Sequence, residues 1–319
     1  MDSVITAAHA EVADIKPATH LPITGQATGP FCDVLRILRG PLAERYERHV
    51  AGMTVTGNSN AKIKIAIPLG TWATTQVDGQ LNCQDVTLLI NEFGLTINNI
   101  NGALHFNDQG LFAQNIQARL VKEPLIVDIN TAKSTNGHDA KTHIDIKVPI
   151  NQATLSTILP TWPWELLEGS APGNLRLNID HQKDNLQSNQ LQYQLQSNLQ
   201  GLEINLPEPL GKTKTSHKSI TVTGAIPSNV AHQIKLDYGE KLHAILRMGA
   251  GDSPKMIAGA ITHDTDITPK LKNSSLSIVG HIKRFDVTGW LALYDHYETA
   301  IHNYVKQQQS PIRTKAKLE

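Results

Sequence analysis

Apolar and polar residues alternate along most of this chain. The pattern is clearest in Lys62–Ile67, His143–Val148 and Leu175–Asp180, where every second side chain is Ile, Val or Leu. A period of two matches a β-strand, whose successive side chains point to opposite faces of a sheet. One apolar and one polar face is typical of antiparallel sheets, because strands of buried parallel sheets are apolar throughout. The pattern therefore predicts a mainly β fold built from antiparallel strands.

The candidate functional residues are the apolar members of these alternating segments, which would share one face of the sheet. Alternation alone fits the closed core of a β-sandwich or barrel as well as an open apolar groove, and the closed core is the simpler interpretation of it. The candidate residues are Ile63, Ile65, Ile67, Ile144, Ile146, Val148, Leu175, Leu177, Ile179, Leu202, Ile204 and Leu206.

Helical spacing of apolar residues is confined to three short segments. We predict helices near Asp33–Tyr46, Ala153–Leu159 and Thr288–Tyr304, with Asn151 as a cap of the second and Asp286 or Thr288 as a cap of the third. The segment 306–319 is polar and contains a proline, so we predict a disordered tail.

The composition narrows the classes of function. Of 319 residues, 40% are hydrophobic but only 5% are aromatic, so the apolar surface is mostly aliphatic. Lys+Arg and Asp+Glu both total 29, and this balance lacks the basic excess that nucleic-acid binding requires. The N-terminus lacks the features of a signal peptide, and no apolar run approaches the roughly 18–20 residues of a membrane-spanning helix.

Motifs of enzyme chemistry are absent from the sequence. There is no nucleophile elbow, no glycine-rich phosphate loop and no HExxH, so we predict no enzyme, no cofactor and no metal site. The Asp264-Thr-Asp266 pair lacks the rest of a calcium loop and is interpreted as a polar turn. Trp162, Trp164 and Trp290 are interpreted as packing at a sheet end or helix–sheet seam, with ligand stacking as the alternative.

The two cysteines, Cys32 and Cys83, could pair in an oxidising compartment, but the sequence alone leaves their state open.

Several short motifs, in this order, resemble the YhdP family of AsmA-like envelope proteins. The resemblance extends from about Leu21 to Tyr294. Its motifs are Pro22-Ile-Thr-Gly25 leading into Asp33-Val-Leu35, Ala66-Ile-Pro-Leu-Gly70 followed by Val77-Asp-Gly79, Ile100-Asn-Gly to Gly110-Leu111, Leu206-Pro-Glu-Pro-Leu-Gly-Lys212, and Gly289-Trp-Leu291.

The resemblance implies an elongated, twisted antiparallel sheet that curls into an apolar groove. It implies a chain that binds phospholipid acyl chains for transport toward the outer membrane, in a periplasmic, inner-membrane-anchored protein that could contact other envelope proteins. Burying acyl CH₂ groups, worth about 0.8 kcal/mol each, requires only an aliphatic surface. The alternative is a structural or adhesive β-sandwich with a closed core and no lipid ligand.

We divide the chain at the proline- and tryptophan-rich segment near residue 165. Residues 1–20 are an irregular lead-in, 21–165 and 166–305 are two β-groove segments, and 306–319 are the tail. Compared with the family pattern, the chain is expected to be an internal or C-terminal-half fragment, since it lacks an N-terminal membrane helix and stops soon after Trp290.

Overall fold

Most of the residues that the structure describes form one long, open β-sheet, in which nearly every strand lies beside the next one along the chain. The computed structural model describes residues 2–11, 19–33, 52–69, 75–91, 94–133, 140–159, 163–181, 191–226, 231–249, 256–265, 269–271 and 275–309. Within these residues, fifteen strands pair in the order β1-β2-β3-β4-β5-β6-β7-β8-β10-β11-β13-β14-β15-β16-β17. Every pairing is antiparallel except the last, β16 with β17, which is parallel.

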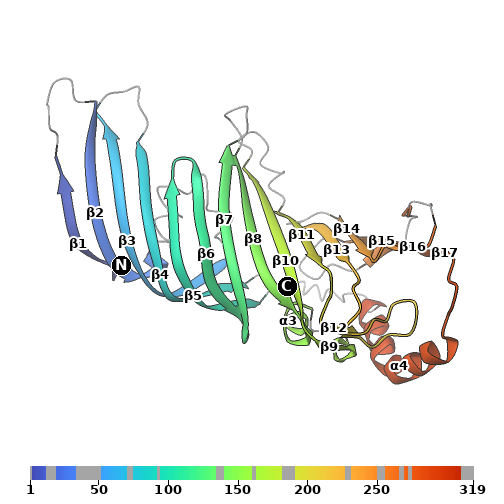
Figure 1. The fold of residues 1–319 in the computed structure, drawn as a ribbon. Helices are drawn as coiled ribbons and strands as arrows, with labels where there is room; N and C mark the ends of the chain where they lie inside the picture. Colours follow the sequence, from blue (N-terminus) through green and yellow to red (C-terminus); the bar gives the residue numbers. More distant parts are fainter. Residues whose placement is uncertain are drawn as a thin grey trace, which may run out of the picture.

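The strands are long in the first part of the sheet and shorter in the second (Figure 1). The first nine are β1 (Val4–Ala10), β2 (His20–Pro30), β3 (Met53–Pro68), β4 (Gln76–Ile90), β5 (Leu95–Asn107), β6 (Gly110–Leu120), β7 (Glu123–Lys133), β8 (Ala140–Ile150) and β10 (Ala171–His181). The remaining six are β11 (Leu191–Ser197), β13 (Ile220–Ile226), β14 (His232–Tyr238), β15 (Leu242–Met248), β16 (Met256–His263) and β17 (Leu276–Gly280).

These observations confirm the predicted mainly β, antiparallel fold, and they separate it from a two-sheet sandwich. In a sandwich two large sheets pack face to face. Among the described residues the second sheet consists only of β9 (Leu167–Gly169) and β12 (Leu202–Ile204). The large sheet is also continuous across the division predicted near residue 165, because β8 pairs directly with β10 over its whole length.

A line of β-bulges bends the first part of the sheet. The register shifts between β3 and β4, β4 and β5, β5 and β6, and β6 and β7. At these shifts Gly57, Asp85, Asn99 and Asn115 all have positive φ, between 50° and 105°. A bulge bends its strand and increases the local twist, and Figure 1 shows these strands curving at their lower ends.

Polar side chains tie the bulges to one another across the strands. The amide of Asp85 donates to Asn101 Oδ1 at 3.0 Å, and Asn99 Nδ2 donates to Asp85 Oδ1. On the next strand, the Asn115 amide donates to Asp128 Oδ1 at 2.7 Å. Asn and Asp tolerate the left-handed conformation better than other non-glycine residues, which explains their use here.

Two of the predicted helices are present in the described residues. In α3 (Gln152–Ile158), Asn151 caps the N-terminus, since its side chain accepts from the amide of Thr154. In α4 (Val287–Gln309), the amide of Gly289 donates to Asp286 Oδ1 at 2.9 Å, so Asp286 is the cap. The third prediction, near Asp33–Tyr46, falls almost entirely outside the described residues.

The helix α4 is longer than predicted, because it continues to Gln309 and so includes the start of the segment predicted as a disordered tail. Its inner side contacts the loop after β12. Trp290 Nε1 donates to the carbonyl of Glu208 at 3.0 Å. Tyr297 donates its hydroxyl to Glu165, which belongs to the short helix η2 (Trp164–Leu166).

Candidate functional site

One face of the large sheet carries an unbroken apolar row across ten strands. Residues that pair directly on neighbouring strands lie on the same face, so the register between strands traces the row from β6 to β17. At about 4.8 Å between strands, ten strands span roughly 43 Å. Its members are Ile116, Val127, Ile146, Leu175, Leu195, Val222, Leu236, Ala244, Ile261 and Ile278.

A second apolar row runs parallel to the first and begins nearer the N-terminus. It crosses the strands from β3 to β11 and consists of Ala61, Leu81, Leu104, Ala113, Ile129, Ile144, Leu177 and Tyr193. The two rows are neighbours, because Ile144 and Ile146 stand two residues apart on β8. We call the surface formed by both rows, together with the Ile63–Ile67 stripe of β3, the apolar face.

The opposite face of the same strands is polar. Across β7, β8, β10 and β11 the paired residues are Asp128, Asp145, Arg176 and Gln194. Arg176 Nε donates to Asp145 Oδ1 at 2.6 Å, and this bond raises the pKa of the guanidinium. Across these four strands, therefore, burial of apolar surface favours one side of the sheet over the other.

Most side chains of the apolar face are neither sealed from solvent nor freely exposed. In the ten-strand row, Ile116 and Ala244 are buried, Ile278 is exposed, and the other seven are half-buried. In the second row, Leu81 is only 1% exposed, whereas Leu177 is half-buried. Side chains of one face therefore shield one another, and much of the aliphatic surface still remains accessible.

Nine of the twelve predicted site residues lie together on the apolar face. Ile65 pairs with Ile23 and Val77, while Leu175 pairs with Ile146 and Leu195. The nine are Ile63, Ile65, Ile67, Ile144, Ile146, Val148, Leu175, Leu177 and Ile179.

The structure places the other three predicted residues elsewhere. Leu202 and Ile204 belong to the small strand β12, and Leu206 follows it in the loop. Leu202 is only 1% exposed and belongs to a closed cluster with Ile150, Ala171, Leu199 and Tyr238. The small sheet thus closes one margin of the apolar face, where Leu195 and Leu236 pack against the cluster.

Two lysines support this margin, and neither is among the predicted site residues, although Lys212 ends the Leu206–Lys212 motif. The ammonium of Lys212 is buried and donates to the carbonyls of Leu199 at 2.7 Å and Thr213 at 2.8 Å. Burial lowers the pKa of Lys212. Backbone carbonyls are suitable partners for a buried ammonium, because an unpaired buried charge would be costly.

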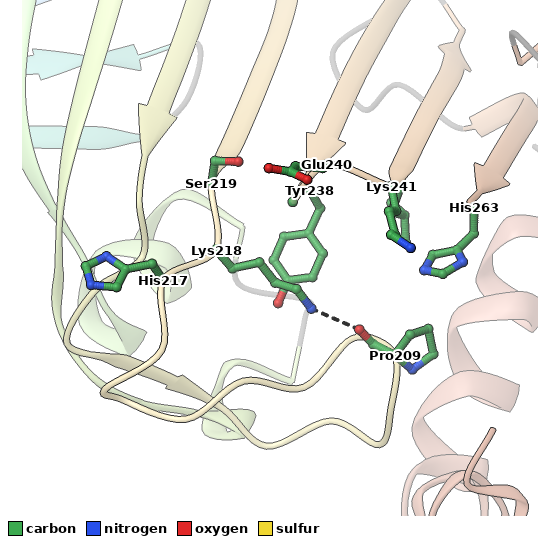
Figure 2. A pocket seen from close by; sticks show the side chains of 10 residues that line it. Pro209, His217, Lys218, Ser219, Tyr238, Glu240, Lys241 and His263 are labelled. Carbon is green, nitrogen blue, oxygen red and sulfur yellow. Dashed lines mark hydrogen bonds between the residues drawn. The ribbon is translucent and has the colours of Figure 1, made fainter. Parts of the chain in front are cut away.

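The second lysine, Lys218, lines a pocket beside the cluster (Figure 2). Its ammonium donates to the carbonyl of Pro209 at 2.9 Å and lies 4.4 Å from the centre of the Tyr238 ring. Tyr238 in turn donates its hydroxyl to the carbonyl of Leu210 at 2.6 Å. The structural role of these two lysines could not be predicted from the sequence, because no recognised binding motif includes them.

The other candidate residues have ordinary structural roles where the structure describes them, while Trp162 and Asp266 lie outside the described residues. Asp264 accepts from Lys241 at 2.9 Å, which lowers the pKa of the carboxyl. The indoles of Trp164 and Trp290 donate to the carbonyls of Leu159 and Glu208, as expected for packing at a seam. Cys32 and Cys83 are both free thiols.

The family of the chain follows from a comparison with family models. The model described as "YhdP protein" matches residues 1–318. The chain belongs to the YhdP family. No curated protein and no solved structure matches it.

Membership of the YhdP family indicates a protein of the cell envelope, in a transport and envelope family not known for enzymes. Membership of this family is consistent with the long open sheet and its one aliphatic face. Among the residues that the structure describes, no helix combines the length and apolarity needed to cross a membrane.

Proposed function

We propose that this chain forms part of a lipid-transfer path, in which phospholipid acyl chains lie along the apolar face during transport toward the outer membrane. The ten-strand apolar row carries the proposal. Covering such an apolar row would stabilise a sheet in water, yet most side chains of this row are only half-buried. The row therefore has apolar surface left for a ligand.

The dimensions of the row suit this ligand. The hydrocarbon core of a bilayer is about 30 Å thick, so the tails of one leaflet reach about 15 Å. A row of roughly 43 Å therefore exceeds the length of one lipid tail severalfold. A lipid could occupy successive positions on it without any change in the chemistry of the contact, because aliphatic contacts are non-directional.

The aliphatic composition also favours movement over tight capture. Each buried CH₂ contributes about 0.8 kcal/mol wherever it lies on a uniform surface. No part of the apolar face needs to bind a tail more strongly than its neighbours do. Uniform binding is the property that a path requires and that a storage site does not.

The proposal is tested by placing a carboxylate on the apolar face. We expect Ile65→Asp and Leu177→Asp to reduce the phospholipid that co-purifies with the protein, measured by native mass spectrometry. The matched controls are Lys62→Asp on β3 and Asn174→Asp on β10, both on the exposed polar face. These controls should retain the lipid bound by the unmodified chain.

Circular dichroism of all four variants separates loss of lipid from loss of fold. Absence of lipid from the unmodified chain, or equal lipid loss in the polar-face controls, would refute the assignment of acyl chains to the apolar face. The closed-sandwich alternative gains no support from any observation on the described residues.

A further inference from the structure

The pocket of Figure 2 lies at the margin of the apolar face. Ile220, Tyr238, Leu242 and His263 pair in sequence across β13, β14, β15 and β16. Each lies two residues from a member of the ten-strand row on the same strand, so both sets share one face. Those row members are Val222, Leu236, Ala244 and Ile261. The pocket measures about 440 Å³, which is within the usual range for small-molecule sites.

Basic side chains line this pocket. Lys218 and Lys241 contribute ammonium groups, His217 and His263 contribute imidazoles, and Glu240 is the acidic side chain among the lining residues. Figure 2 shows Lys218 lying across the Tyr238 ring, with Lys241 and His263 on the ends of neighbouring strands. The aliphatic row thus changes to cationic groups at one margin, the arrangement that an amphiphile with an anionic head would match.

The surroundings of Lys218 favour a bound anion in this pocket. Lys218 is half-buried, and its ammonium contacts the Pro209 carbonyl and the Tyr238 ring, while the Glu208 carboxylate acts on it through its charge. Burial first, and then the nearby charge of Lys212, lower the pKa of Lys218. A phosphate oxygen would offset both the desolvation and the repulsion between the two lysines, through a charge-assisted hydrogen bond.

Lys241 offers a second positive charge from the other side of the pocket. Its partner is Asp264, whose pKa is lowered by the bond to Lys241 and further by the charges of His263 and Lys283. Asp264 therefore interacts with several basic groups at this end of the sheet, while Glu240 is the acidic side chain in the lining of the pocket itself. The side chain of Lys241 is 52% exposed, so its ammonium can also reach a ligand in the pocket.

We propose that this pocket binds the phosphate of a lipid headgroup, with Lys218 and Lys241 as its ligands, while the acyl chains of the same lipid lie on the apolar face. The inference rests on the proposed function and adds a fixed entry or exit position to a path that is otherwise uniform. The two lysines would recognise a phosphate group, and we expect this phosphate to belong to a lipid headgroup.

The experiment compares two soluble lipids that differ only in phosphate. Dihexanoyl phosphatidic acid and dihexanoylglycerol are titrated into the purified chain, and binding is measured by calorimetry. A charge-assisted hydrogen bond contributes enough to predict that the unmodified chain binds the phosphatidic acid about tenfold more tightly. Lys218→Gln and Lys241→Gln should each remove most of this preference and leave dihexanoylglycerol binding unchanged within about twofold.

The matched control is Lys235→Gln, on the polar face of β14, which should keep the full preference. If Lys218→Gln does not fold, as judged by circular dichroism, Lys241→Gln decides the result. Equal binding of both lipids by the unmodified chain, or a preference unaffected by either folded pocket variant, would overturn the phosphate site while leaving the proposed function intact. Failure of both lipids to bind would instead refute the proposed function, and this inference with it.

A third titration, with inorganic phosphate, identifies the source of the anion. We expect no measurable binding at the concentration at which the phosphatidic acid saturates, because the free ion lacks the contribution of the tails. Binding of inorganic phosphate as tight as that of the lipid, and lost in Lys218→Gln, would overturn the lipid headgroup as the ligand.

Discussion

Two leucines in one cross-strand row allow a direct test of how open the apolar face is. Leu81 on β4 and Leu177 on β10 belong to the same row and point to the same face. Leu81 is 1% exposed, whereas Leu177 is half-buried. We therefore expect Leu81→Ala and Leu177→Ala, which make the same chemical change, to differ in their effect on stability.

The magnitudes follow from burial. Truncating a fully buried leucine costs about 3–5 kcal/mol, because the lost transfer free energy is increased by the cavity left behind. Leu177 keeps part of its side chain accessible and no closed cavity forms, so only the transfer free energy of the removed groups is lost and the expected cost is about 1–2 kcal/mol.

Hydrogen exchange followed by mass spectrometry is the suitable assay, because it reports the free energy of opening strand by strand. Since 1.4 kcal/mol corresponds to a factor of ten, amides of β4 in Leu81→Ala should exchange roughly 10² to 4 × 10³ times faster. Amides of β10 in Leu177→Ala should exchange about ten times faster. Equal acceleration in the two variants would mean that the face near Leu177 is covered as completely as at Leu81, and the argument for an open face would fail.

Three further predictions concern single residues. Asn99, at φ 50° in its bulge, should tolerate Asn99→Gly, whereas Asn99→Val should lower the free energy of unfolding by about 1–2 kcal/mol in thermal melts, and equal stability of the two variants would contradict the strained backbone. Burial raises the pKa of Tyr238 to about 12 from 10.0, so the unfolded chain loses this proton first and the free energy of unfolding should fall between about pH 10 and 12. Tyr238→Phe should reduce that fall in pH-dependent denaturation, and an unchanged pH profile would contradict the raised pKa of Tyr238. Cys83 is buried and its thiol has a pKa raised to about 11, so iodoacetamide should modify the partly exposed Cys32 first in the folded protein, and mass spectrometry showing the reverse order would contradict this burial.

The sequence predicted the strands well because the period of two depends only on local geometry. Leu175, Leu177 and Ile179 could be assigned to one face without knowing their neighbours. The alignment of Leu175 with Ile146 and Leu195 into a row could not be predicted, since it depends on the register between strands.

The positions of Leu202, Ile204 and the bulges could not be predicted from the sequence. Leu202 and Ile204 alternate as regularly as the residues of the apolar face, yet they lie in a three-residue strand within a closed cluster. Alternation indicates that one side is apolar but not what that side contacts. The bulges at Asp85 and Asn99 likewise left no clear trace, because Asp and Asn are equally common in turns.

The strictly sequential order of the strands makes the length of the sheet modular. Each strand of the large sheet pairs with its neighbours along the chain, and among the strands that the structure describes only β9 and β12 are left out of this order. Insertion of one more hairpin would lengthen the apolar row by about 10 Å without rearranging the strands already present. Evolution could therefore adjust the length of such a sheet by duplicating or deleting hairpins, so that the number of strands sets the length of the apolar row.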